Sequence, residues 1–271
     1  MEKAKLFMKK IFKLLMKPEM RILPGQLAFF LVMTLIPLVA LIAAIASTLS
    51  ISTEGLRTAI ENSVPSSVAS IFSSVISGNG LNFNMIVFYI SAFILASNGA
   101  YSMINASNEI YKVQPNGVVS RRLKAVTMTF VLVGLFLFLL LVPVFGNTLF
   151  DILKEATNDN IVVRIIKEMM VFLKYPIILL ILYMNIKLMY VIAPDKEIPG
   201  KTTNKGAIFT TGGWVIATEI FAFYIEKFAR YDVFYGSVSN ILILLLWIYL
   251  LSYIYVLGMV INASDYNGEL D

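Results

Sequence analysis

The sequence predicts an all-α fold, a polytopic membrane protein with six transmembrane helices and additional interfacial amphipathic helices. Hydrophobic residues make up 58% of the 271 residues, charged residues only 14%, and the mean hydropathy is +0.80. Soluble chains contain about 45–50% apolar and about 25% charged residues, so this apolar excess requires a non-aqueous solvent. No long polar stretch remains from which a soluble domain could form, and residues 1–271 are expected to form one membrane domain.

Four of the predicted spans lie in windows without a charged residue. A bilayer core requires about 20 apolar residues per helix. The uncharged windows place spans at residues 27–49, 84–105, 125–148 and 238–262. These segments are too long and too continuously apolar for the alternating strands of a membrane barrel, so helices are expected.

Two further spans each contain a charge in their interior. Residues 175–193 are interrupted by Lys187, and residues 206–226 by Glu219. Proline also falls within or beside three spans, where the missing amide donor should bend or end the helix. The prolines concerned are Pro37, Pro143 and Pro176.

Three polar segments are expected to be helical without crossing the bilayer. Residues 1–21 combine an apolar face with many lysines, a pattern typical of a cytoplasmic amphipathic helix that binds anionic lipid headgroups. The alternative interpretation of this segment is a topology signal with no further role. Residues 53–77 and 151–174 are interpreted as interfacial caps on the external face.

The distribution of Lys and Arg predicts the orientation, because cytoplasmic connections are enriched in these residues. Fourteen Lys and Arg residues lie in the amino-terminal segment and in the second and fourth connections, against seven on the other side. Both termini are therefore expected in the cytoplasm. Three basic residues of the second connection, Arg121, Arg122 and Lys124, are explained in this way, and Asp195 is expected in a solvated loop.

The composition argues against most enzyme chemistry. The chain has no cysteine and no histidine, which excludes thiolate nucleophiles, imidazole bases and ordinary zinc sites. It also lacks a phosphate-binding glycine loop, a nucleotide fingerprint and a serine elbow. We expect no enzymatic activity, no cofactor and no metal.

Ionisable residues inside a span are functional candidates because they cost free energy there. Glu219 lies 13 residues past Gly206, about 20 Å along a helix, so its carboxylate should be protonated, paired or exposed to an internal cavity. Lys187 lies seven residues before Pro194, about 10 Å from a helix end. Its long side chain can also extend to the membrane surface.

Asparagines form a polar stripe on the second span. Asn98, Ser102, Asn105 and Asn108 are spaced by three and four residues, so most of them share one helix face. Such side chains join helices by hydrogen bonds, or they line a path for a solute. Both interpretations remain open for Asn98, Asn105 and Asn108.

Four blocks of sequence resemble the YihY/BrkB family of bacterial inner-membrane proteins. They are LAFFLVMTLIPLVALIAAIA (Leu27–Ala46), NEIY (Asn108–Tyr111), YVIAPD (Tyr190–Asp195) and YGSVSNILILLLWIYLLSYIYVLGMVINA (Tyr235–Ala263). The resemblance extends over nearly the whole chain and implies six membrane helices in the bacterial cytoplasmic membrane. The family that the chain resembles is labelled a virulence factor. The molecular activity usually suggested for this family is transport of a solute or lipid.

One position departs from the family pattern. Relatives often read Gly-Ala-Glu-Leu-Asn near the end of the last helix, whereas residues 258–262 read Gly-Met-Val-Ile-Asn. The acid is replaced by Val260 and Asn262 is retained, which makes Asn262 a candidate site residue. The family has also carried a ribonuclease label, but RNA binding would require an accessible basic groove with stacking aromatics. We expect no nucleic-acid partner.

The predicted function is transport or permeation of a small solute or lipid through a cavity bordered by the second, fifth and sixth helices. Glu219, Asn98 and Asn105 are expected to line this cavity. Because the protein is expected to lie in the membrane, membrane lipids are its expected partners. The alternative is a non-transporting scaffold or envelope-integrity factor. The sequence is compatible with a homo-oligomer.

Overall fold

The computed structural model describes residues 15–48, 83–134, 160–228, 231 and 235–267. All regular structure in these residues is helical, which confirms the all-α prediction for this part of the chain. Residues 118–134 also form a helix. The other elements are α2 (Glu19–Thr48), α5 (Phe83–Tyr111), α7 (Asn160–Ile192), α8 (Asn204–Lys227), the short 3-10 helix η1 (Gly236–Val238) and α10 (Ser239–Tyr266).

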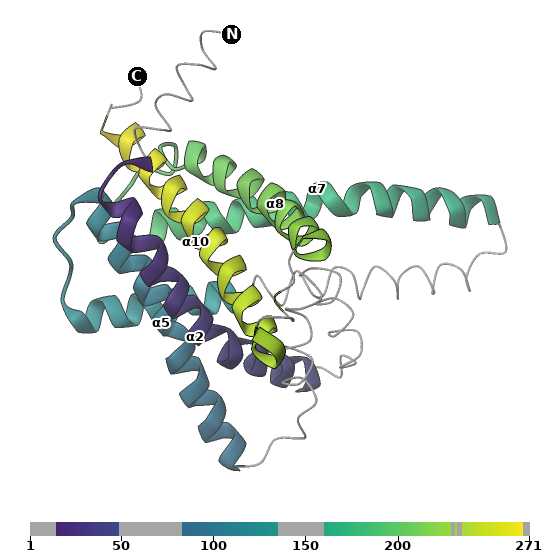
Figure 1. Ribbon diagram of the computed structural model, residues 1–271, viewed down its shortest axis with the longest axis horizontal. Helices are drawn as coiled ribbons and strands as arrows, with labels where there is room; N and C mark the ends of the chain where they lie inside the picture. Colours follow the sequence, from purple (N-terminus) through teal and green to yellow (C-terminus); the bar gives the residue numbers. More distant parts are fainter. Residues whose placement is uncertain (1–14, 49–82, 135–159, 229–230, 232–234, 268–271) are drawn as a thin grey trace, which may run out of the picture.

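Helix α10 is the centre of the bundle. It packs against α2 on one side and α8 on the other, α2 also packs against α5, and α7 packs against α8. Figure 1 shows α10 between α2 and α8, with one half of α7 extending away from the other helices. The buried core lies among these helices, and its largest enclosed side chains include Tyr190, Tyr255 and Leu27.

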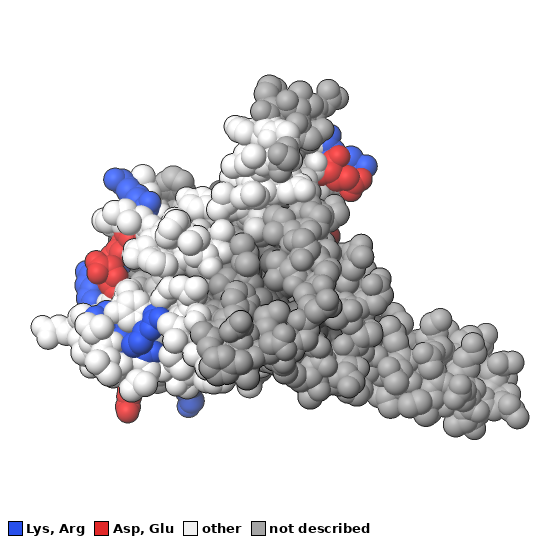
Figure 2. Space-filling model, turned by 90° about the horizontal axis from the view of Figure 1, so that it is seen from below, with Lys and Arg blue, Asp and Glu red and all other residues white. Residues whose placement is uncertain are grey.

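Five helix ends meet at one end of the bundle. Lys17, just before α2, donates a hydrogen bond to Ser264 near the end of α10 (3.3 Å). The ring of Tyr111, the last residue of α5, lies 6.2 Å from that of Tyr266. Lys205 at the start of α8 forms an ion pair with Asp265, and α7 ends beside this start. In Figure 2, which is seen from below Figure 1, most of the visible Lys and Arg side chains of the described residues lie on the left of the molecule.

The helices are longer than the predicted spans. Helix α2 begins at Glu19 rather than near residue 27, and the helix expected from residue 125 already begins at 118. Residues 135–148 of that span, which include Pro143, lie outside the described residues. So do residues 1–14, the whole of the predicted cap at 53–77, and residues 151–159 of the other predicted cap.

Proline does not end the helices in which it can be followed. Helix α2 continues through Pro37, and α7 continues through Pro176. Residues 160–174, the described part of the predicted cap 151–174, are helical as expected and belong to the same helix as the predicted span 175–193. Their location at the membrane interface stays a prediction. A helix tolerates an internal proline where the carbonyl left without its amide donor finds another hydrogen-bond partner. The apolar sequence on both sides of Pro176 is therefore compatible with one continuous helix.

Two described helices, α8 and α10, are long and apolar enough to cross a membrane, and Pro176–Ile192 within α7 is a shorter apolar segment. Only 22% of the apolar window of α8 is buried within the chain. Exposed Ile208, Ile216, Ile220 and Phe223 cover its outer surface. A core helix of a soluble protein would have such residues covered, so this surface is suited to lipid.

Candidate functional site

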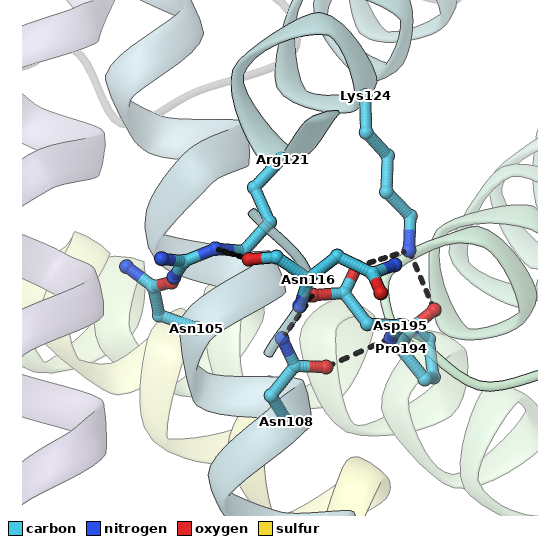
Figure 3. Close-up of polar contacts among 7 residues, drawn as sticks. All are labelled: Asn105, Asn108, Asn116, Arg121, Lys124, Pro194 and Asp195. Carbon is cyan, nitrogen blue, oxygen red and sulfur yellow. Dashed lines mark hydrogen bonds and ion pairs between the residues drawn. The ribbon is translucent and has the colours of Figure 1, made fainter. Parts of the chain in front are cut away.

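A buried carboxylate joins three segments of the chain at the bundle end described above. Asp195, in the connection between α7 and α8, has a fully buried side chain that forms an ion pair with Lys124 at 3.0 Å. Its other carboxylate oxygen accepts hydrogen bonds from the Asn108 side chain (2.7 Å) and the Asn116 backbone amide (3.0 Å). Figure 3 shows these groups converging on Asp195.

The backbone also contributes to this junction. Asn108 accepts a hydrogen bond from the backbone amide of Asp195 (2.8 Å), so the two residues exchange two bonds. Lys124 donates to the carbonyl of Pro194 (2.5 Å). These bonds fix the relative positions of three segments: helix α5, the helix at 118–134 and the α7–α8 connection.

The electrostatic environment keeps Asp195 ionised. Burial acts to raise the pKa of the Asp195 carboxyl, but hydrogen bonds from Lys124, the Asn116 amide and Asn108, with the charge of Lys124, hold that pKa below its usual value of 3.8. The junction therefore contains a buried ion pair at neutral pH.

Two arginines of the same helix contact the asparagine stripe of α5. Arg122 donates to the Asn98 side chain (2.7 Å) and to the carbonyl of Ile94 (2.9 Å). Arg121 donates to the Asn105 side chain (2.7 Å). Within the described residues neither guanidinium is paired with a carboxylate, so both positive charges are held by neutral acceptors.

The bonds of Arg121 and Arg122 leave donors available. Arg121 also donates to the Asn116 carbonyl (3.0 Å) and lies over the ring of Tyr101 at 5.3 Å. Each arginine thus makes two hydrogen bonds to described residues, and a guanidinium has five N–H donors. Both side chains are half-buried. This face of α5 is a fixed, positively charged surface able to bind an anion.

A second polar seam crosses the buried contact of α7, α8 and α10. The Tyr190 hydroxyl donates to the Tyr255 carbonyl (2.7 Å), which leaves it to accept from Thr210 (2.7 Å). The Asn262 side chain accepts a hydrogen bond from the Gly206 amide (2.7 Å). The Tyr255 hydroxyl and the Asn262 amide nitrogen are buried without a partner in the described part of the chain.

The structure places the remaining candidates apart from these networks. Glu219 is exposed on the outer surface of α8, and among the described residues no hydrogen bond or ion pair joins it to another candidate. The helical period puts it on the same face as exposed Ile216, Ile220 and Phe223. This placement does not match the enclosed cavity expected for Glu219.

Lys187 is half-buried in α7 and lies 6.0 Å from the ring centre of Tyr183. It lines an open, mostly apolar groove of about 490 Å³ together with Leu180, Met184 and Leu188. Its side chain also extends toward Gly200, in the connection that follows α7. Lys187 therefore reaches toward the end of its helix.

Sequence reasoning missed Asp195, Arg121 and Arg122 as partners of the asparagines. Asp195 was expected in a solvated loop, and the arginines were explained by topology alone. A usable signal existed, because Asn108 begins the block NEIY and Asp195 ends the block YVIAPD. The structure shows that these two blocks meet through their polar residues.

Comparison with known proteins identifies the family of this chain. The family described as "Virulence factor BrkB" matches residues 12–269. The chain belongs to the virulence factor BrkB family. It is also similar to the ribonuclease-like protein YfkH of Bacillus subtilis, with 30% identity over 261 residues that cover 95% of this chain and 94% of YfkH.

Other BrkB-family relatives match over a shorter stretch. The UPF0761 membrane protein Nmul_A0452 of Nitrosospira multiformis is 39% identical over 75 residues, which cover 28% of this chain and 18% of that protein. The UPF0761 membrane protein PA0951 of Pseudomonas aeruginosa is 32% identical over 83 residues, 31% of this chain and 20% of that protein. No solved structure matches the chain. The chain is therefore a membrane protein of the BrkB and UPF0761 group.

Proposed function

We propose that this protein is a transporter or permease that moves a small solute or a lipid, specifically an anionic one, across the bacterial cytoplasmic membrane. The observation that supports this function is the pair of guanidiniums on the asparagine stripe. Asn98 precedes the end of α5 by 13 residues, about 20 Å along the helix. Arg122 reaches this depth through its bond to Asn98.

A cation at such depth requires a reason. An arginine at the centre of a membrane helix costs on the order of 2.5–3.5 kcal/mol on insertion scales, and such residues mark substrate and ion paths. Among the described residues Arg122 is bound by neutral acceptors rather than by a carboxylate, so none of them cancels its charge. Basic side chains of this kind select anions in membrane pores.

The proposal includes the topology predicted from the sequence, with six spans and both termini in the cytoplasm. The bundle end described above supports this topology. There the starts of α2 and α8 lie beside the ends of α5, α7 and α10, and many basic residues lie at this end. Anionic lipids are the proposed partners of this basic end, and no nucleic acid is involved. The proposed role is not enzymatic.

One observation favours the alternative, a scaffold or envelope-integrity factor that organises lipids or copies of itself. Glu219 lies on an exposed apolar face of α8 rather than in an enclosed cavity. A carboxylate on such a face is suited to a contact with another chain. In this role the arginine–asparagine bonds would only join helices.

Reconstitution of the full chain into liposomes distinguishes the two functions. The lipid arm measures the loss of NBD-phosphatidylglycerol fluorescence to external dithionite, and the solute arm measures uptake of radiolabelled inorganic phosphate and lactate. We expect transport by the wild-type chain in one arm, with a rate at least tenfold lower for Arg122→Gln. Arg122→Lys retains the charge but loses the planar pair of donors, so its rate should be intermediate.

Lys201→Gln is the matched control, because Lys201 is an exposed cation outside the stripe. Its rate should equal that of the wild-type chain. Absence of transport in both arms by well-folded wild-type protein would reject the transporter in favour of the scaffold. Equal rates for Arg122→Gln and wild type would remove the arginine face from the path.

A further inference from the structure

Two charges of opposite sign lie on different outer faces of the helix bundle. Glu219 is exposed on α8, and no other described residue forms a hydrogen bond or an ion pair with it. Arg122 binds the Asn98 side chain and the Ile94 carbonyl, and no described carboxylate pairs with it. Each charge therefore lacks a counterion within the described part of its own chain.

Exposed apolar side chains accompany both charges. They are Ile216, Ile220 and Phe223 on α8, and Ile90, Ile94 and Phe130 on the face that carries Arg122. A charged group among lipid-facing apolar side chains costs free energy unless a partner pairs with it. Each face is therefore suited to a partner that is apolar and carries one opposite charge.

The two charges lie at matching depths in the bundle. The start of α8 and the end of α5 meet at the same end, where both lie beside the end of α10. Glu219 follows the start of α8 by 15 residues, about 22 Å. Asn98, which binds Arg122, precedes the end of α5 by 13 residues, about 20 Å. Copies that share one orientation in a bilayer therefore present the two charges at similar heights.

The two charges of a single chain are separated by the core of the bundle. Helix α10 packs against α8 on one side and against α2 on the other, and α2 packs against α5 (Figure 1). Glu219 lies on the outer surface of α8. A second copy of the chain, in contrast, can bring its own Arg122 face against this surface.

We propose that Glu219 of one copy forms an ion pair with Arg122 of a neighbouring copy within the membrane. Arg122 uses two of its five N–H donors within its chain. Three donors remain, and a carboxylate can accept two of them in parallel. The apolar side chains beside the two charges pack against each other and replace lipid.

The contact joins two different faces, so the assembly is heterologous. Each added copy leaves one positive face and one negative face available, and the copies form a closed ring or an open row. The contact requires the membrane orientation but not transport. Under the proposed transport function, Glu219 of the neighbouring copy competes with the substrate anion for Arg122.

The test measures association of the purified full chain in liposomes, without any transport assay. Single-molecule photobleaching counts the copies in each assembly over a series of protein-to-lipid ratios. The wild-type chain should associate, and Glu219→Gln and Arg122→Gln should each weaken association by at least about tenfold. Glu226→Gln is the matched control, because Glu226 is an exposed acid of α8 that pairs with Lys227. This variant should associate as the wild-type chain does.

A mixture of the two variants tests the heterologous contact. The Arg122→Gln chain retains Glu219, and the Glu219→Gln chain retains Arg122. Equal amounts of the two should form dimers but no larger assemblies, whereas each variant alone should remain monomeric. A symmetric contact between identical faces would give no such rescue.

Photo-cross-linking provides a second measurement that leaves Arg122 in place. Benzoylphenylalanine in place of Ile216, one helical turn from Glu219, should cross-link to residues 90–94 or 130 of another copy, as mapped by mass spectrometry. Glu219→Gln in the same chain should lower the yield by at least about tenfold.

A wild-type chain that is monomeric at every protein-to-lipid ratio would overturn the proposal. So would cross-links confined to α8 of the other copy, or an unchanged yield with Glu219→Gln. A monomeric chain that transports would retain the proposed function without this contact. Association through these residues without transport would retain the contact and reject the transporter.

Discussion

Asn262 of α10 caps the start of α8 by accepting a hydrogen bond from the backbone amide of Gly206 at 2.7 Å. The first amides of a helix lack partners within the helix, and Thr203, the residue before α8, makes no side-chain cap. A residue 56 positions away in the chain therefore does the work of a local cap. This bond fixes the height at which α8 lies against α10.

Replacing Asn262 should test this cap. Asn262→Ala leaves a buried amide of Gly206 without an acceptor, and we expect a loss of about 2 kcal/mol in the free energy of unfolding. Equilibrium unfolding in mixed detergent micelles measures it. Asn185→Ala is the control, since Asn185 lines the open groove on α7, and it should change stability by less than about 0.5 kcal/mol.

The closest approach of α8 and α10 depends on glycine. A Cβ at Gly206 would collide with the Gly258 carbonyl and the Asn262 side chain, whereas a Cβ at Gly212 of the same helix meets nothing within 4 Å. Gly206→Ala should therefore destabilise the fold by at least about 3 kcal/mol. Gly212→Ala should stabilise it by about 0.5–1 kcal/mol. Similar melting temperatures for the two variants would contradict this packing.

Acid should weaken the junction at Asp195. The folded-state pKa of Asp195 lies below 3.8, so its carboxylate stabilises the fold above pH 3.8. This stabilisation is lost as the pH falls through the folded-state pKa. The wild-type Tm should therefore drop below about pH 3.8, and Asp195→Asn should show a smaller drop from a lower starting Tm. Glu197→Gln, an exposed neighbour, should leave the wild-type profile unchanged.

The ion pair of Lys124 and Asp195 should be coupled in a double-mutant cycle. Lys124→Met leaves a buried carboxylate without its cation and should cost about 3 kcal/mol. The double variant Lys124→Met/Asp195→Asn should cost less than the sum of the two changes, with a coupling energy of about 1–3 kcal/mol. Additive effects would show that the pair makes no net contribution. Lys201→Met serves as the exposed control.

The helices could be predicted from the sequence because their signal is local. Uncharged windows located four of the six segments, and long apolar runs with a single interior charge located the other two. The described part of each is helical apart from Ala193. The ends were less accurate, since α2 and the helix at 118–134 begin several residues early with charged residues in their first turns. Charged residues in the sequence indicate where a segment leaves the hydrocarbon core of the bilayer. They do not indicate where the helix itself begins or ends.

The polar contacts could not be predicted in the same way because they join segments distant in sequence. Asp195 resembled a solvated loop residue until Asn108 and Lys124 were seen to enclose it. Glu219 lies in the interior of α8, as its position in the sequence indicated. Position along a helix does not determine which side of that helix faces the bundle. The asparagine stripe was found from its spacing, whereas its partners Arg121 and Arg122 required the fold.

Helix α7 has 33 residues, about 50 Å in length, whereas the hydrocarbon of a bilayer is about 30 Å thick. Its first half contains Arg164, Lys167 and Lys174, so in the proposed topology about 20 Å of this charged segment extends beyond the hydrocarbon. Because the chain has no cysteine, a thiol introduced at position 164 would be the sole target of a membrane-impermeant maleimide. Labelling at this position in intact cells would therefore report the compartment in which the charged segment of α7 lies.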